Sequence, residues 1–233
     1  MLHVIIFVVV SMKKKKLDII YEDKNIIVVN KPSGLLTIST EKEKEKTLYH
    51  EVSDYIKKSN PKAKIFIVHR LDKDTSGIVM FTKNQNLKYK YQNNWDKLVL
   101  KRGYIAIVDG VLDNKKGTIK SYLKETKTLL VYSSNDKKNG KLAITNYNVI
   151  KENDKYSMLD IEIKTGRKNQ IRVHLNDLGY PILGDKKYGN KKSMLNRLAL
   201  HSNCLIVTNP TTNKKMEFNA KIPKSFELLF KEN

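Results

Sequence analysis

The sequence predicts an α+β fold in which a few helices flank a large mixed or antiparallel β-sheet. Short runs that are apolar, or that alternate between apolar and polar residues, recur along most of the chain, as is typical of strands. Helical spacing is found in fewer segments and does not alternate regularly with these strands, which argues against a doubly wound parallel sheet. The 233 residues suffice for one large domain or two small lobes, and no long linker divides them.

Local patterns predict the individual elements. Thr47 is a favourable N-cap for a helix whose apolar residues recur every three to four positions. Gly179 and Pro181 end another helix, because glycine adopts the left-handed conformation of a C-terminal cap and proline does not continue a helix. In order, the expected elements are strands within 17–40, an exposed loop at 41–46, a helix at 47–58, strands at 65–68 and 78–81, a helix at 84–98, a strand at 104–111, several strands within 117–150, a strand at 158–163, a helix from about 168 to 179, strands at 197–207 and 215–218, and a short helix at 225–230.

The charge of the chain predicts a polyanionic partner. Forty-five Lys and Arg residues against 24 Asp and Glu residues give a formal net charge of +21. Nucleic acid is the leading candidate, and a Lys-rich solvated surface is the alternative. The single cysteine, Cys204, excludes an internal disulfide and a thiolate zinc site, and the histidines lack metal-ligand spacing, so no metal is expected. A reducing compartment fits, with the cytoplasm as the default.

The first eleven residues are expected to be a non-native or disordered extension. Residues 4–10 are wholly apolar but well short of the ~20 residues that a membrane-spanning helix needs. The basic run at 13–16 follows this stretch, whereas a signal peptide places its positive charge before the apolar region. Met12 has the appearance of a natural start, so the folded domain is expected over residues 12–233, with no membrane partner.

The polar turn at residues 69–77 is the strongest candidate for chemistry. A tight connection between two buried strands holds its side chains on a rigid support. Arg70 and Lys73 are near enough in sequence to keep Asp72 ionised, and an ionised carboxylate can act as a nucleophile, a base or a metal ligand. An ordinary polar turn is the alternative. A calcium loop is disfavoured, because its twelfth position holds Lys83 instead of Glu.

A second candidate site lies at residues 165–174. Arg167, Lys168 and Arg172 are expected in the opening turns of a helix, where each cation opposes the helix dipole by roughly a few tenths of a kcal/mol. A bound phosphate or carboxylate would offset this cost. A solvated basic face is the alternative. Arg172 lies at the edge of the expected buried face, and a buried arginine requires a carboxylate partner, for which Asp72 is a candidate.

Two further signals are weak by themselves. Tyr104 begins an expected strand, where a tyrosine usually belongs to the core, although its hydroxyl can reach a pocket. The segment 184–189 is bounded by glycines, but it is too loose to count as a phosphate-binding motif.

Taken together, these motifs resemble the RluA-type pseudouridine synthases from about Leu17 to the end of the chain. The segment His69-Arg70-Leu71-Asp72 followed by Thr75-Ser76-Gly77 resembles the signature of that family and is highly specific. The supporting matches occur in the family's order at residues 30–35, 104–106, 165–172, 178–189 and 200–201.

The resemblance implies a pseudouridine-synthase-like fold, with a long curved mixed or antiparallel sheet, flanking helices and a central RNA-binding cleft. It implies an isomerase that converts specific uridines of rRNA or tRNA to pseudouridine by base flipping, without a cofactor or metal. Asp72 would be the essential catalytic aspartate, Arg172 would pair with it and keep it ionised, and Tyr104 would stack on the flipped uracil and handle a proton. Arg70 would fill the space that the base leaves.

The remaining expectations concern RNA contacts and organisation. Asn169 stands where the family usually has a histidine, and an amide can form hydrogen bonds but does not titrate. A single catalytic domain without an S4-type RNA-binding module is expected, acting as a monomer. Further RNA contacts are expected from His69, Arg167, Lys168 and Lys31.

Two other classes of protein stay open at this point. One is an RNA-binding or ribosome-assembly factor with vestigial chemistry, although such a protein has no need of the carboxylate. The other is a uridine-directed RNA methyltransferase, which would require a Gly-rich cofactor-binding turn that the sequence lacks. An assay for uridine isomerisation separates these alternatives.

Overall fold

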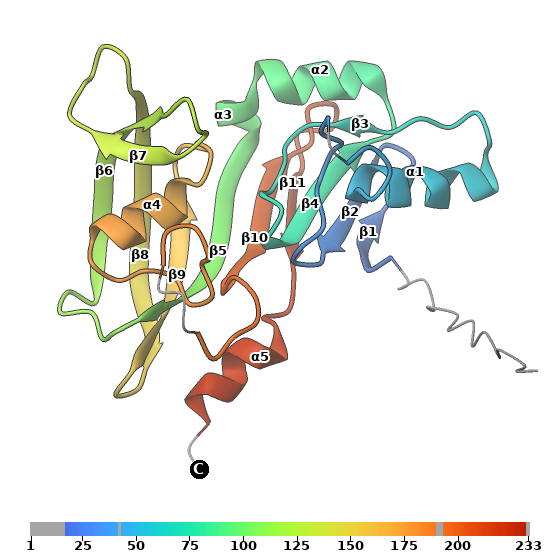
Figure 1. Ribbon diagram of the computed structural model, residues 1–233. Coiled ribbons are helices and arrows are strands. Elements are labelled where there is room, and N and C mark those ends of the chain that lie inside the picture. The colour runs from blue at the N-terminus through green and yellow to red at the C-terminus, as the bar shows by residue number, and fades with distance from the viewer. Residues whose placement is uncertain (1–16, 42, 190–192, 232–233) are drawn as a thin grey trace, which may run out of the picture.

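A mixed β-sheet forms the framework of the protein (Figure 1). The computed structural model describes residues 17–41, 43–189 and 193–231. Eleven strands of the described chain share this sheet, in the order β1-β2-β4-β10-β5-β9-β8-β6-β7, with β11 beside β10 and β3 beside β4. The strands are β1 (Ile19–Glu22), β2 (Ile26–Lys31), β3 (Phe66–Ile67), β4 (Ser76–Thr82), β5 (Val99–Asp109), β6 (Lys116–Glu125), β7 (Val131–Ser134), β8 (Lys141–Glu152), β9 (Tyr156–Ile163), β10 (Leu200–Thr208) and β11 (Lys215–Asn219).

The pairing of these strands confirms the expected mixed sheet. Neighbouring strands in the described chain run antiparallel, except that β4 and β10 pair in parallel at the centre. Few helices accompany the sheet, as expected for an α+β fold. They are α1 (Leu48–Ser59), α2 (Gln85–Asn93), α3 (Trp95–Leu98), α4 (Gln170–Asp177) and α5 (Lys224–Glu227), which continues into the 3-10 turn η1 (Leu228–Phe230).

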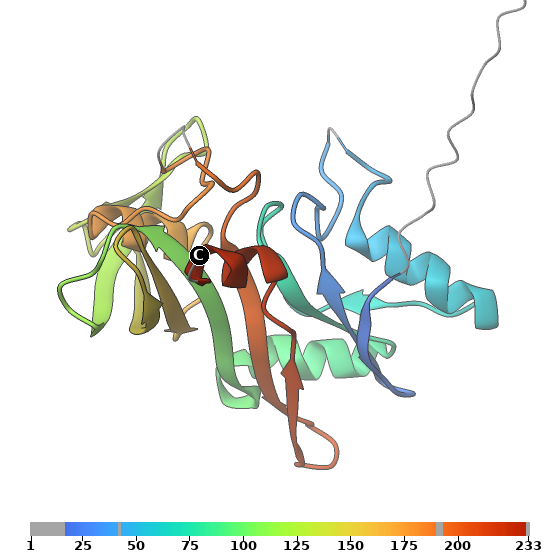
Figure 2. The same cartoon turned by 90° about the horizontal axis from the view of Figure 1, so that it is seen from below.

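Helices cover both faces of β2 and β4, which explains why these strands are almost wholly apolar. Side chains alternate across a strand, so Ile27 and Val29 face one side of β2 and Ile26 and Val28 face the other. The first pair packs in a cluster with α1, and the second pair packs in a cluster with α2. Figure 2 shows the two helices on opposite sides of these strands.

Several element boundaries differ from the expected ones. The helix expected at 84–98 is broken at Asn94 into α2 and α3, because Asn94 has a non-helical backbone conformation. The strand expected at 65–68 is reduced to Phe66–Ile67. Strand β5 begins at Val99, so Tyr104 lies in the middle of a strand rather than at its start.

Helix α4 begins at Gln170, later than expected. The preceding residue, Asn169, adopts a left-handed conformation with φ 53°. Asparagine tolerates this conformation better than most residues. Arg167 and Lys168 therefore lie in the connection before the helix, and only Arg172 of the three basic residues is helical.

Other local expectations are confirmed. The hydroxyl of Thr47 accepts a hydrogen bond from the backbone N–H of His50 and so caps α1. The thiol of Cys204 is buried in β10. The extension expected at residues 1–11 lies outside the described residues. Within the described ranges, none of the helices has the length and apolar character to cross a membrane.

Candidate active site

The connection from β3 to β4 carries Asp72. Hydrogen bonds from the segment that follows β2 hold this connection in place. The hydroxyl of Thr37 donates to the carbonyl of Leu71 at 2.8 Å and accepts from its N–H at 3.2 Å. The hydroxyl of Ser33 donates to the carbonyl of Asp74 at 2.6 Å. These bonds hold the backbone on both sides of Asp72, as a rigid support for a reactive carboxylate requires.

Lys31 belongs to this support and not to the surface, which corrects its expected role in RNA binding. Its side chain is 0% exposed, and its ammonium group donates to the carbonyls of Pro32, Leu35 and Lys73 at 3.1, 2.6 and 2.9 Å. All three N–H groups are thus used inside the protein, and only the charged form has three to donate. Burial lowers the pKa of Lys31 to about 7, against the opposing effect of Asp74 and Asp72.

A small cavity of about 90 Å³ brings the three expected catalytic residues together. Asp72 from the β3–β4 connection, Tyr104 from β5 and Arg172 from α4 all line it. Arg70 and Arg167, which were expected to contact RNA, line it as well. Residues separated by up to a hundred positions in the sequence therefore meet at one point, where the β3–β4 connection, β5 and the beginning of α4 lie close together.

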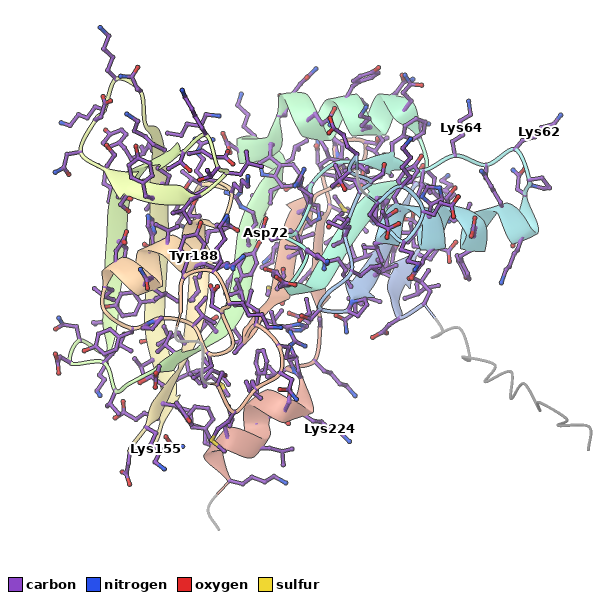
Figure 3. The ribbon with its side chains drawn as sticks, viewed as in Figure 1. Lys62, Lys64, Asp72, Lys155, Tyr188 and Lys224 are labelled. Atoms are coloured by element: carbon purple, nitrogen blue, oxygen red, sulfur yellow. The ribbon has the colours of Figure 1, made fainter. Side chains whose placement is uncertain are left out.

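Asp72 is half-buried at this cavity. Within the described chain, its carboxylate forms no side-chain hydrogen bond and no ion pair shorter than 4.0 Å. Its charge nevertheless acts to raise the pKa of both Tyr104 and Arg172, which shows that all three groups are close. Figure 3 shows Asp72 near the middle of the molecule and Lys62 at its edge. The carboxylate is therefore held in place through its backbone while its oxygens remain free to meet a ligand.

Tyr104 lies on a central strand, paired with Ile161 of β9 on one side and Ser202 of β10 on the other. Its ring packs against the hydrophobic clusters of both halves of the sheet. Burial raises the pKa of Tyr104 to about 12, although Arg102 acts in the opposite direction. The phenol is therefore protonated at neutral pH and can donate a hydrogen bond into the cavity.

Arg172 pairs directly with Asp185 and not with Asp72, which corrects the expected ion pair. Its Nε and Nη2 donate to the two carboxylate oxygens of Asp185 at 2.7 and 2.6 Å, and both residues are buried. Its Nη1 donates to the side-chain oxygen of Asn169 at 3.1 Å, and its guanidinium lies 5.1 Å from the ring centre of Tyr188. Asp72 acts on this cation only through space.

The cause of this difference is the loop that follows α4. Asp185 occupies a turn closed by hydrogen bonds from the N–H groups of Lys187 and Tyr188 to its Oδ1. Gly184 has φ 71°, and a Cβ there would lie 2.0 Å from the carbonyl oxygen of Arg197. Only glycine allows the backbone at residue 184 to lie this close to Arg197. The loop can therefore pass near α4 and place Asp185 next to Arg172.

Two expected RNA contacts lie away from the cavity. The Nε2 of His69 accepts a hydrogen bond from the N–H of Met80 at 3.0 Å, and its ring packs against Trp95. Burial lowers the pKa of His69 to about 4, so this histidine is neutral and belongs to the framework. Lys168 is exposed and forms an ion pair with Glu125.

Sequence reasoning missed the residues that support the site. Asp185 lies in the segment 184–189, which is too loose for a phosphate-binding motif, and the sequence predicts no role for it. Tyr188 and Asn169 share a hydrogen bond of 3.2 Å and both contact Arg172. In the sequence, only the positions of these two residues within the family motifs point to a role at the site. Among the described residues, no group of three or more His, Cys, Asp or Glu side chains is arranged to hold a metal ion.

The fold is similar to that of solved pseudouridylate synthase domains. The solved structure of human RNA pseudouridylate synthase domain containing 4 is similar with a TM-score of 0.74 and 24% identity, covering 90% of each chain. Human RNA pseudouridylate synthase domain containing 1 is similar with a TM-score of 0.73 and 23% identity, covering 88% of this chain and 83% of that one. At these identities the likeness concerns the fold alone.

Sequence comparison gives the family. The model of the RNA pseudouridylate synthase family matches residues 25–177. The uncharacterized RNA pseudouridine synthase YhcT of Bacillus subtilis is 35% identical over 92% of this chain and 71% of its own length. Ribosomal large subunit pseudouridine synthase C of Rickettsia prowazekii is 37% identical over 89% of this chain and 69% of its own length. The chain therefore belongs to the RNA pseudouridine synthases, in their RluA-type branch, which isomerise uridine to pseudouridine in RNA.

Proposed function

We propose that this protein isomerises specific uridines in structured rRNA or tRNA, with Asp72 as the essential catalytic group. The observation that carries the proposal is the meeting of Asp72, Tyr104 and Arg172 at one small cavity. Ribosomal RNA is the first substrate to test, because three relatives are named as large-subunit pseudouridine synthases. We further propose that the described residues act as one catalytic unit and as a monomer in the cytoplasm.

The reaction sets the demands on the site. The bond between N1 of uracil and C1′ of ribose breaks, a bond between C5 and C1′ forms, the proton on C5 is lost and N1 gains a proton. The atoms other than this exchanged proton are conserved and no redox change occurs. The protein has to hold the detached base, turn it and accept the proton, which a carboxylate and a hydroxyl at one cavity are suited to do.

The small size of the cavity supports base flipping as part of this proposal. A volume of about 90 Å³ admits one base but no base pair, so a paired uridine has to leave its stack. Extrusion costs a few kcal/mol, as a rough figure, and contacts between cationic side chains and phosphates offset part of it. Arg70 and Arg167 line the same cavity and lie at its exposed side, where they can contact the displaced strand.

Roles for the three central residues follow from their surroundings. Asp72 can attack C6 of uracil or C1′ of ribose, or assist without forming a bond to carbon. The pKa of Tyr104 is about 12, so its phenol is protonated at neutral pH and is a poor general base. Tyr104 therefore acts through stacking and through its proximity to the reacting proton. Arg172 is charged under all ordinary conditions and supplies a fixed positive potential beside Asp72.

Substitution of Asp72 tests the proposal. We expect Asp72→Asn to lower turnover by at least about a thousandfold, because an amide is neither a nucleophile nor a base. Binding of RNA should persist, since the amide keeps the shape of the side chain. Tritium release from transcripts of large-subunit rRNA and tRNA labelled at C5 of uridine measures turnover, and filter binding measures affinity.

The matched control is Asp154→Asn, which removes an exposed carboxylate in the turn between β8 and β9. This variant should release tritium at the rate of the unsubstituted protein. Continued turnover by Asp72→Asn would refute the catalytic assignment. Absence of turnover in the unsubstituted protein on all RNA, with RNA binding intact, would instead favour a vestigial RNA-binding factor.

A further inference from the structure

A second and larger cavity lies on the other side of the loop that carries Asp72. It has a volume of about 790 Å³, within the range of ~300–1,000 Å³ that is usual for ligand sites. The loop is a wall shared by both cavities, because Asp72 and Thr75 line the small one while Lys73, Asp74 and Ser76 line the large one. A ligand in the large cavity would therefore touch the residues next to the catalytic aspartate.

Arg197 is the main cation of this larger cavity. Its Nη2 donates to the hydroxyl of Ser76 at 2.6 Å, its Nε donates to the carbonyl of Leu198 at 3.1 Å, and its guanidinium lies 5.0 Å from the ring centre of Phe226. No carboxylate of the described chain lies within 4.0 Å of it. Burial lowers the pKa of Arg197. The guanidinium is thus fixed in position and partly shielded from water, and it has no anionic partner within the described chain.

Lys31 also lines this cavity, but its ammonium group is buried and already donates to three backbone carbonyls, so it adds positive potential without a free N–H group. Three more lysines line the cavity, namely Lys73, Lys186 and Lys221. Carboxylates are also present, and they are Asp18, Glu51 and Asp74. Asp18 accepts a hydrogen bond from Asn30 at 2.9 Å, so part of this negative charge is already engaged.

We propose that the larger cavity binds a phosphate-bearing nucleotide of the substrate RNA, next to the uridine that enters the small cavity. A phosphate would accept from the Nη1 of Arg197, which forms no hydrogen bond within the described chain, and would supply the anionic partner that this guanidinium lacks. RNA is favoured over a free nucleotide, because a strand that delivers one base to Asp72 has to continue past the shared loop. This assignment rests on the proposed function for the identity of its ligand.

Equilibrium binding tests the proposal without any need for turnover. The probe is a fluorescein-labelled RNA hairpin with uridines in its loop, and Asp72→Asn is the background. We expect Arg197→Gln to weaken binding about tenfold and to lower the slope of log K against log salt by about one. The control Lys155→Gln removes an exposed lysine that does not line the cavity and that lies well away from Asp72 (Figure 3), so it should change the affinity less than about twofold.

A neutral substitution separates the cavity from the general charge of the surface. Asn196 is exposed and lines the cavity, so Asn196→Trp should fill it and weaken binding of the hairpin while the net charge stays unchanged. Arg197→Lys should restore part of the affinity lost in Arg197→Gln, since a cation is retained. If Arg197→Gln fails to fold, Asn196→Trp still carries the test.

Two outcomes would overturn the proposal. In one, Arg197→Gln and Asn196→Trp both bind the hairpin as tightly as Lys155→Gln. In the other, free uridine 5′-monophosphate binds the unsubstituted protein and is lost in Arg197→Gln, while the affinity for RNA is unchanged, which would assign the cavity to a free nucleotide. Neither result depends on isomerisation, so failure here is distinct from failure of the Asp72 prediction.

Discussion

At the scale of single residues, the guanidinium of Arg172 is held from three directions. Asp185 takes two of its N–H groups, Asn169 takes a third, and Tyr188 lies against its face. Burial by itself acts to lower the pKa of Arg172, but the hydrogen bonds and charge of Asp185 outweigh it and the pKa is raised. The cation beside Asp72 is therefore fixed in both charge and position.

Removal of the negative partner should show how much this arrangement contributes to stability. Asp185 is 1% exposed, and Asp185→Asn would leave Arg172 buried without a counter-charge. We expect the free energy of unfolding to fall by about 3–5 kcal/mol, as is typical when one member of a buried ion pair is lost. Urea unfolding followed by the fluorescence of Trp95, the single tryptophan, measures the change.

The control is an ion pair of the same type at the surface. Glu152 pairs with Lys115 at 2.6 Å, and both side chains are well exposed. Glu152→Gln should change the free energy of unfolding by no more than about 1 kcal/mol. Similar small effects for both variants would mean that the buried pair is not a stabilising contact.

At the scale of elements, the parallel pairing of β4 with β10 joins the two halves of the sheet. His201 faces Ser76 and Ser202 faces Gly77 across this pairing. Gly77 has φ 114°, and a Cβ there would lie 2.1 Å from the carbonyl oxygen of Ser202. The close approach of the two strands beside the Asp72 loop therefore depends on the absence of a side chain at residue 77.

This geometry predicts that Gly77→Ala is strongly destabilising. The methyl group would meet backbone atoms that belong to a central strand and have no room to move. We expect a loss of at least about 3 kcal/mol in the free energy of unfolding, measured by urea denaturation.

Gly179 provides the matched comparison for this substitution. It also has a positive φ, 89°, but a Cβ there meets no heavy atom of the described chain within 4 Å. Gly179→Ala should therefore cost only about 1–2 kcal/mol, the usual cost of the left-handed conformation. An equal loss in the two variants would contradict the steric argument.

At the scale of the whole molecule, buried histidines make the stability depend on pH. Burial lowers the pKa of both His174 and His201 to about 4, whereas an unfolded histidine titrates near 6.5. Between these values the unfolded chain binds more protons than the folded one, so the free energy of unfolding falls as the pH drops from about 6.5 to 4. The ring of His174 lies between the hydroxyls of Thr145 and Ser121, at 2.9 and 3.0 Å.

We expect a loss of about 2 kcal/mol for each of these histidines between pH 7.5 and pH 5. Urea unfolding at the two pH values measures the loss. His174→Gln removes one titrating group, so its difference between the two pH values should be smaller even if its stability at pH 7.5 is lower. A free energy of unfolding that is equal at both pH values would rule out this linkage.

Much of the molecule could be predicted from local sequence. The helix that follows Thr47, the strand Ser76–Thr82 and the alternation along Tyr156–Ile163 depend on residues close in the chain, and the structure contains all three. The interrupted helix at Asn94 and the late start of α4 at Gln170 were missed, because a single residue with a non-helical conformation decided each boundary.

The sequence by itself determined the family, the mixed sheet with few helices, and the grouping of Asp72, Tyr104 and Arg172 as candidates, because motifs and apolar periodicity are properties of neighbouring residues. Tertiary structure alone decided which groups pair. Arg172 pairs with Asp185, and Lys31 is buried against the loop that carries Asp72. Such pairs form between residues that are distant in the sequence and that the loops bring together. The electrostatic interaction of a buried charge also depends on how far water is excluded from it. Neither property can be read from a local sequence pattern.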